Sequence, residues 1–87
     1  MPVSVLPTIH LNGTSAKTLL EQQLDAGNAI VEAIAKLGEA CPNGRDFYPQ
    51  GTGAISTAMR EHEDRIARLR SVQTELPAIA EYISNHL

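Results

Sequence analysis

The chain has 87 residues, a formal net charge of −3 and one cysteine, Cys41. This length accommodates a single domain, and a chain so short buries only about 60–65% of its unfolded surface. One cysteine excludes an internal disulfide, and the acidic balance argues against a protein that coats DNA. No apolar run approaches the ~20 residues of a membrane span. We therefore expect a cytoplasmic protein that needs a partner copy, or very regular helix packing, for its stability.

The first element in chain order is an extended arm over residues 1–13. Pro2 and Pro7 each remove a backbone donor and restrict the chain, and Asn12 and Gly13 form a turn signal. These residues exclude a long helix and leave room at most for a short strand. We therefore predict an extended arm that precedes the helical part of the chain.

A first helix is predicted over residues 15–40, where Thr14 or Ser15 supplies the capping oxygen. An apolar stripe recurs at i+3 and i+4 spacing along it: Leu20, Leu24, Gly27, Val31, Ile34 and Gly38. Its small residues allow two explanations. The helix could cross another one closely at a subunit interface, or it could pack by ordinary ridges and grooves.

A second helix is predicted over residues 54–76. Its apolar seam follows strict alternating spacings of four and three, which is typical of left-handed helix pairing: Ile55, Met59, His62, Ile66, Leu69, Gln73, Leu76, Ala80, Ile83 and Leu87. The ring of Pro77 should clash with the carbonyl of Gln73 and break this helix. Residues 77–87 then form a C-terminal helical extension that runs past the first helix, and another segment or subunit must cover it.

These elements predict an all-α fold in one domain. Its architecture is an antiparallel helical hairpin with an extended N-terminal arm and a Pro-broken C-terminal helix. A hairpin cannot bury both of its faces alone, so we expect it to self-associate as a homo-oligomer.

The connection over residues 41–53 is longer than most helix–helix connections and is the first candidate site. Gly51, Thr52 and Gly53 precede a helix, whose free amides and positive dipole end favour an anion. An arginine fork suits a phosphate, and aromatic rings can stack on a base. The predicted ligand-binding set combines these side chains with one from the second helix: Arg45, Phe47, Tyr48, Gln50, Thr52 and His62.

A structural explanation of the same connection stays open. Phe47 and Tyr48 would close the open end of the hairpin, while Arg45 pairs with Asp46 or with a helix end. A ligand site would instead require Arg45 and the aromatic rings to converge with polar groups in a concave pocket. The sequence does not decide between these two arrangements.

His62 lies in the seam, where a polar residue is usually hydrogen-bonded and sets the register of the helices. We expect it to be shielded and partnered, with ligand contact as the alternative. A zinc-binding helix would need a second histidine four residues on, where this chain has Ile66. Cys41 has no basic neighbour, and no nucleophile motif is present. We therefore expect no catalytic residue, no metal and no cofactor.

The charged side chains of the second helix form ion pairs at i,i+4 spacing: Arg60–Asp64, Glu61–Arg65 and Asp64–Arg68. Such pairs stabilise a helix by about 0.2–0.5 kcal/mol each and are typical of a solvated face. Arg70 is the exception, because neither of its neighbours at this spacing is acidic.

Three segments carry a family resemblance: IHLNGTS at residues 9–15, NGRDFYPQG at residues 43–51, and the pair Glu61-His62 followed by Arg65. Over nearly the whole chain they resemble small proteins of tailed phages and prophages. A weaker likeness, in size and hairpin plan only, exists to phage counter-defence sponges, which sequester cyclic-nucleotide or ADP-ribose-derived immune signals.

The resemblance implies a phage-encoded, non-enzymatic binding protein that acts in the cytoplasm of a bacterial host. The expected function is a sponge that sequesters a phosphate-bearing signal nucleotide. The alternative is a protein-binding inhibitor of a host system, or an adaptor in the virion or its assembly. An adaptor would need an exposed apolar patch on the helices rather than a polar pocket in the loop.

Overall fold

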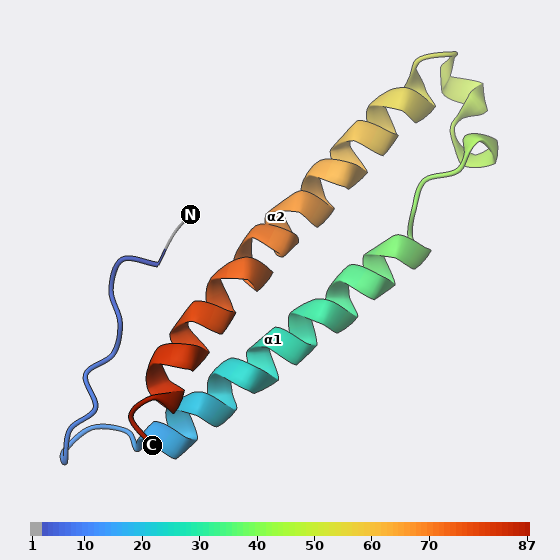
Figure 1. The fold of residues 1–87 in the computed structure, drawn as a ribbon. Coiled ribbons are helices and arrows are strands. Elements are labelled where there is room, and N and C mark those ends of the chain that lie inside the picture. The colour runs from blue at the N-terminus through green and yellow to red at the C-terminus, as the bar shows by residue number, and fades with distance from the viewer. Residues whose placement is uncertain (1–2) are drawn as a thin grey trace.

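A computed structural model describes residues 3–87 and consists of two long antiparallel helices (Figure 1). Helix α1 spans Ala16–Glu39 and helix α2 spans Ala54–Ser84. The connection between them contains two short 3-10 turns, Gly44–Asp46 and Tyr48–Gln50. Residues 3–10 lack regular structure and return on the α2 side of the hairpin (Figure 1). The predicted all-α hairpin with an extended arm is confirmed, and the described residues contain no strand.

The ends of α1 follow from local chemistry that the sequence signals. The hydroxyl of Ser15 accepts a hydrogen bond from the Thr18 amide at 3.2 Å, so Ser15 rather than Thr14 is the cap. At the other end the Ala40 amide donates to the carbonyls of the last turn, and Pro42 then disfavours further helix. Met1 and Pro2, the first residues of the predicted arm, lie outside the described residues.

The predicted break at Pro77 is wrong, because α2 continues through this residue as one helix. Proline removes one backbone donor and strains the preceding turn, at a cost of roughly 3 kcal/mol in a helix interior. The flanking residues Leu76, Ala80 and Ile83 are half-buried or buried. Packing on both sides of the proline therefore holds the helix together, so the predicted extension over residues 77–87 is the last part of α2.

The predicted overhang at the C-terminal end is also wrong. The end of α2 lies beside the start of α1 (Figure 1), and Ile83 is only 1% exposed. At the opposite end of the hairpin, the Cys41 and Met59 sulfurs lie 3.7 Å apart. This register leaves the first turns of α2 beyond the end of α1, beside the connecting loop. The longer helix thus projects at the loop end, not at the C-terminus.

The predicted seam of α2 is confirmed from Ile55 to Ile83, since all of its members in this range are buried or half-buried. On α1 the shielded stripe is turned slightly from the predicted one: Ala16, Leu20, Gln23, Gly27, Ile30, Ile34 and Leu37. Two of the predicted stripe residues, Leu24 and Val31, stay 51% and 50% exposed. Alternating spacings of four and three on both helices bring Gln23 and Ile30 into the seam instead.

The hairpin leaves much of its apolar surface uncovered. Ile83 and His62 are the only buried side chains among residues 3–87. The chain exposes 6438 Å², whereas a compact monomer of its mass exposes about 5,000 Å². Its radius of gyration is 18.6 Å, against about 12 Å for a compact domain of this length. The two helices therefore form an elongated pair with open faces rather than a closed core.

Gly27 provides a test of how open the hairpin is beside α1. A Cβ at this position would meet no atom of another segment within 4 Å, so α2 does not need the glycine for close crossing. We expect Gly27→Ala to raise the free energy of unfolding by about 0.5–1 kcal/mol, which is several degrees in Tm for a chain of this size.

The matched control is Gly51→Ala, which also has open space but has a φ of 110° that strains any side chain. This control should lower the Tm in the same thermal denaturation series. A lower Tm for Gly27→Ala would mean that a neighbouring molecule occupies the space beside Gly27 in solution.

Candidate functional site

The loop end of the hairpin forms an open hollow of about 530 Å³. Phe47 is half-buried there against the first turns of α2, where the small side chains Ala54 and Ala58 leave room for its ring. Gly51, with a φ of 110°, reverses the chain just before α2 begins. The hollow is lined by both segments: Phe47, Gln50, Gly51, Thr52 and Gly53 of the loop, and Ala54, Thr57, Ala58 and Glu61 of α2.

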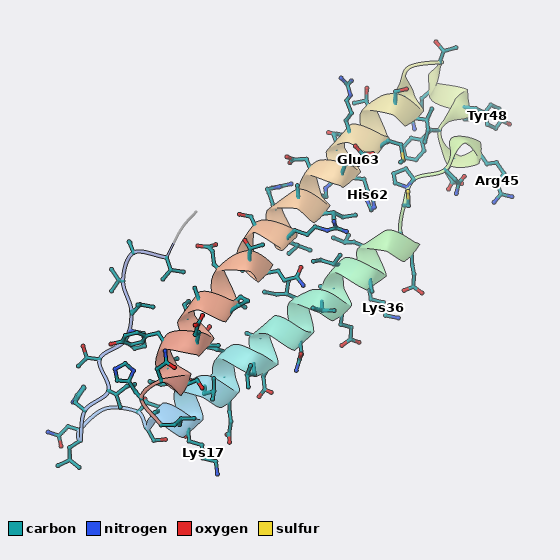
Figure 2. All side chains as sticks on the ribbon, viewed as in Figure 1. Lys17, Lys36, Arg45, Tyr48, His62 and Glu63 are labelled. Carbon is teal, nitrogen blue, oxygen red and sulfur yellow. The ribbon has the colours of Figure 1, made fainter. Side chains whose placement is uncertain are left out.

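Arg45 and Tyr48 do not line this hollow. Both side chains lie at the outer end of the loop and point away from the helices (Figure 2), and Tyr48 is 77% exposed. The expected pairing of Arg45 with Asp46 is not formed, since the ion pairs of residues 3–87 are Lys36–Glu39 and Asp64–Arg68. Of the two aromatic side chains that were expected to close the end of the hairpin, only Phe47 therefore does so.

The electrostatics of the hollow are mixed. Gly53 caps α2 without a side-chain hydrogen bond, and the positively polarised first turn of the helix, at Gly53 and Ala54, lines the hollow. Glu61 places a carboxylate on the same wall. An anion entering the hollow would gain from the amides and lose from this carboxylate, while Arg45 lies outside it.

His62 lies between the helices, below the loop (Figure 2), and is 5% exposed. The expected shielding is confirmed, but the expected partner is absent: the buried Nε2 has no hydrogen bond among the described residues. The seam of α1 near its end offers only aliphatic side chains, such as Ile34 and Leu37. The predicted ligand set is thus divided among the hollow (Phe47, Gln50, Thr52), the outer loop surface (Arg45, Tyr48) and the interior (His62).

The described residues contain no cluster of three histidine, cysteine or acidic side chains that could hold a metal ion. Cys41 and Met59 supply two soft sulfur donors 3.7 Å apart at the loop end of the seam. Cys41 is exposed and its thiol is free. Two sulfur atoms alone fall short of the three or four ligands that protein metal sites usually provide.

A second concave surface, which the sequence stripe did not reveal, runs along one side of the two helices. We call it the apolar groove; it is about 350 Å³ and is lined by Gln23, Leu24, Gly27, Asn28 and Val31 of α1, and by Gln73, Leu76, Pro77 and Ala80 of α2. None of these residues carries a formal charge. Leu24 and Val31, seven residues apart, are displaced from the seam to the rim of the groove. That spacing is the sequence signal that could have located it.

The solvated face of α2 is confirmed in part. Arg68 Nε lies 3.1 Å from an Asp64 oxygen, while the other two predicted pairs are not within 4.0 Å. Arg60 instead donates a hydrogen bond to the Thr57 hydroxyl at 3.4 Å. This face is polar and open, as expected for side chains in water.

Comparison of the chain with protein-family models, with curated proteins and with solved structures finds no match. No helix within residues 3–87 combines the length and the apolar character that crossing a bilayer requires.

The buried Nε2 of His62, which has no hydrogen-bond partner among the described residues, leads to a prediction about stability. Burying a polar atom without a hydrogen bond costs about 1–3 kcal/mol, so His62→Met should raise the free energy of unfolding by about 1 kcal/mol or more. His62→Ala should lower it by roughly 2 kcal/mol or more, because truncation leaves a cavity in the seam. Urea denaturation followed by circular dichroism measures both variants. A loss of stability in His62→Met would show that Nε2 is hydrogen-bonded in solution.

Proposed function

We propose that this protein is a non-enzymatic interaction module whose apolar groove binds a protein partner. The observation that carries the proposal is the half-exposure of Leu24 and Val31 at the rim of the groove, in a chain where Ile83 is the only buried apolar side chain among residues 3–87. Such a surface is what an adaptor or a protein-binding inhibitor needs.

The lining of the groove favours a protein over a nucleotide. Its polar side chains are amides only (Gln23, Asn28 and Gln73), and a phosphate would find no positive charge there. A groove between two antiparallel helices, lined by apolar side chains, can bind the apolar face of a third helix. Binding of an amphipathic helix in such a groove is a common mode of peptide recognition. Both alternatives from the phage resemblance, an inhibitor of a host protein and an assembly adaptor, act by this kind of contact.

Nucleotide capture at the loop end is a second proposal, supported by one specific observation. The hollow at the start of α2 joins an aromatic ring, Phe47, to the polar side chains of Gln50 and Thr52 and to uncapped helix amides. Arg45 is exposed and outside any ion pair of the described residues, so it is available to close over a phosphate. The carboxylate of Glu61, on the wall of the hollow, would repel a phosphate bound there.

The groove is tested with bis-ANS, a dye whose fluorescence rises on apolar surfaces. We expect the chain as a monomer to bind the dye and Val31→Glu to reduce the bound fraction at least fivefold, because a carboxylate at the rim disfavours apolar contact. Leu11→Glu is the matched control, since Leu11 is 98% exposed in the arm and remote from the groove residues. Equal dye binding by Val31→Glu and the unmodified chain would refute the groove as the binding surface.

The nucleotide proposal is tested by thermal shift with cyclic dinucleotides, cyclic trinucleotides and ADP-ribose. If the groove defines the function, none of them should raise the Tm. A ligand at 100 times its Kd would stabilise the protein by about 2.7 kcal/mol, which such a measurement detects easily. If one does bind, Arg45→Ala should weaken it at least tenfold without unfolding the chain, whereas Asp46→Ala should not.

A further inference from the structure

Another hollow, of about 340 Å³, lies on α2 and is lined by Glu63, Ile66, Ala67 and Arg70. Glu63, Arg70 and Pro77 are spaced seven residues apart, so they lie on the same side of the helix. Pro77 also lines the groove. This hollow and the apolar groove therefore lie on one side of the hairpin, which we call the open side.

The charges on the open side form no ion pair within the described part of the chain. Glu63, Ala67 and Arg70 are all exposed, and among residues 3–87 neither charged side chain forms an ion pair. At i,i+4 spacing Glu63 has Met59 and Ala67 as neighbours, while Arg70 has Ile66 and Thr74. On the opposite side of the same helix, Asp64 and Arg68 are paired at 3.1 Å.

The charges at Glu63 and Arg70 can pair between two copies of α2 that run antiparallel. Ala67 stands between an acid four residues before it and a base three residues after it. If two copies of α2 cross antiparallel near Ala67, Glu63 of each copy lies opposite Arg70 of the other, which is the two-fold pattern of an isologous interface. The small side chain of Ala67 leaves space for the helices to approach.

We propose that a second copy of this chain covers the open side, with α2 packed antiparallel against α2 of the other copy and two Glu63–Arg70 pairs flanking Ala67. The resulting symmetric dimer has four long helices around a shared apolar centre. The inference rests on the proposed function, because it names the first partner of the surface that includes the groove.

The exposed area agrees with this assembly. The chain exposes 6438 Å², roughly 1,400 Å² more than a compact monomer of its mass. A stable dimer needs about 800 Å² from each partner. A second copy of the chain would supply the missing cover.

The test is a charge exchange read by sedimentation equilibrium. The unmodified chain should be a dimer of 9.4 kDa subunits at micromolar concentration. In Glu63→Arg both facing charges are positive and in Arg70→Glu both are negative, so each variant alone should dissociate at least tenfold more readily. An equimolar mixture of the two should form a heterodimer of nearly the original affinity, because both opposite-charge pairs are restored.

The matched controls make the same changes on the other side of α2, as Glu61→Arg and Arg65→Glu, and should dimerise like the unmodified chain. Circular dichroism confirms that each variant is helical. A monomeric unmodified chain, disruption by the controls, or a mixture that does not reassociate would overturn this interface. If the chain is monomeric yet binds bis-ANS through the groove, the dimer fails while the proposed function stands. If the chain is a dimer, the dye is tested on dissociated Glu63→Arg, in which the groove is uncovered, and failure of Val31→Glu to reduce dye binding in that background defeats the proposed function.

Discussion

The seam between α1 and α2 is the interaction on which the whole structure depends. Each helix contributes one stripe with alternating spacings of four and three, and the two stripes meet over most of the length of α1. Because a helix has apolar contacts on only one stripe in such a pair, everything outside the seam stays open to solvent. The exposed rim residues Leu24 and Val31 and the projecting loop both follow from this limit.

The seam itself contains polar side chains, and these reduce its stability. His62 is buried without a partner for Nε2, and Gln23 is half-buried without a partner for Oε1. Polar residues at seam positions weaken a helix pair but help to set its register and its number of chains. In this protein they add to the shortage of buried apolar surface, which the proposed partner surface would relieve.

The loop end of the hairpin and the apolar groove differ in chemistry. The loop end has uncapped helix amides, an aromatic ring and an isolated arginine, but Glu61 and the outward position of Arg45 keep these groups from forming one anion site. The groove farther along the hairpin is uncharged and apolar. Protein binding needs no rearrangement of the groove, whereas nucleotide binding needs Arg45 to move. This difference is why the groove carries the proposed function.

The sequence by itself determined the features that depend on spacing along one segment. A cap at Thr14 or Ser15, the extent of α1, the start of α2 and the seam of α2 through His62 all follow from local hydrogen bonding or from a period of 3.5 residues. The hairpin followed as well, because two amphipathic helices of comparable length must bury their stripes against each other. The burial of His62 was predictable for the same reason.

Tertiary structure decided the features that depend on which surfaces meet. Packing of Leu76, Ala80 and Ile83 outweighs the backbone donor lost at Pro77, so a local rule that predicts a break fails there. The partner helix selects Gln23 and Ile30 for the seam and leaves Leu24 and Val31 outside, a rotation that the α1 sequence cannot specify alone. The 3-10 turns of the loop send Phe47 inward and Arg45 and Tyr48 outward, because the direction of a side chain in a loop is set by its turns and not by its proximity in sequence.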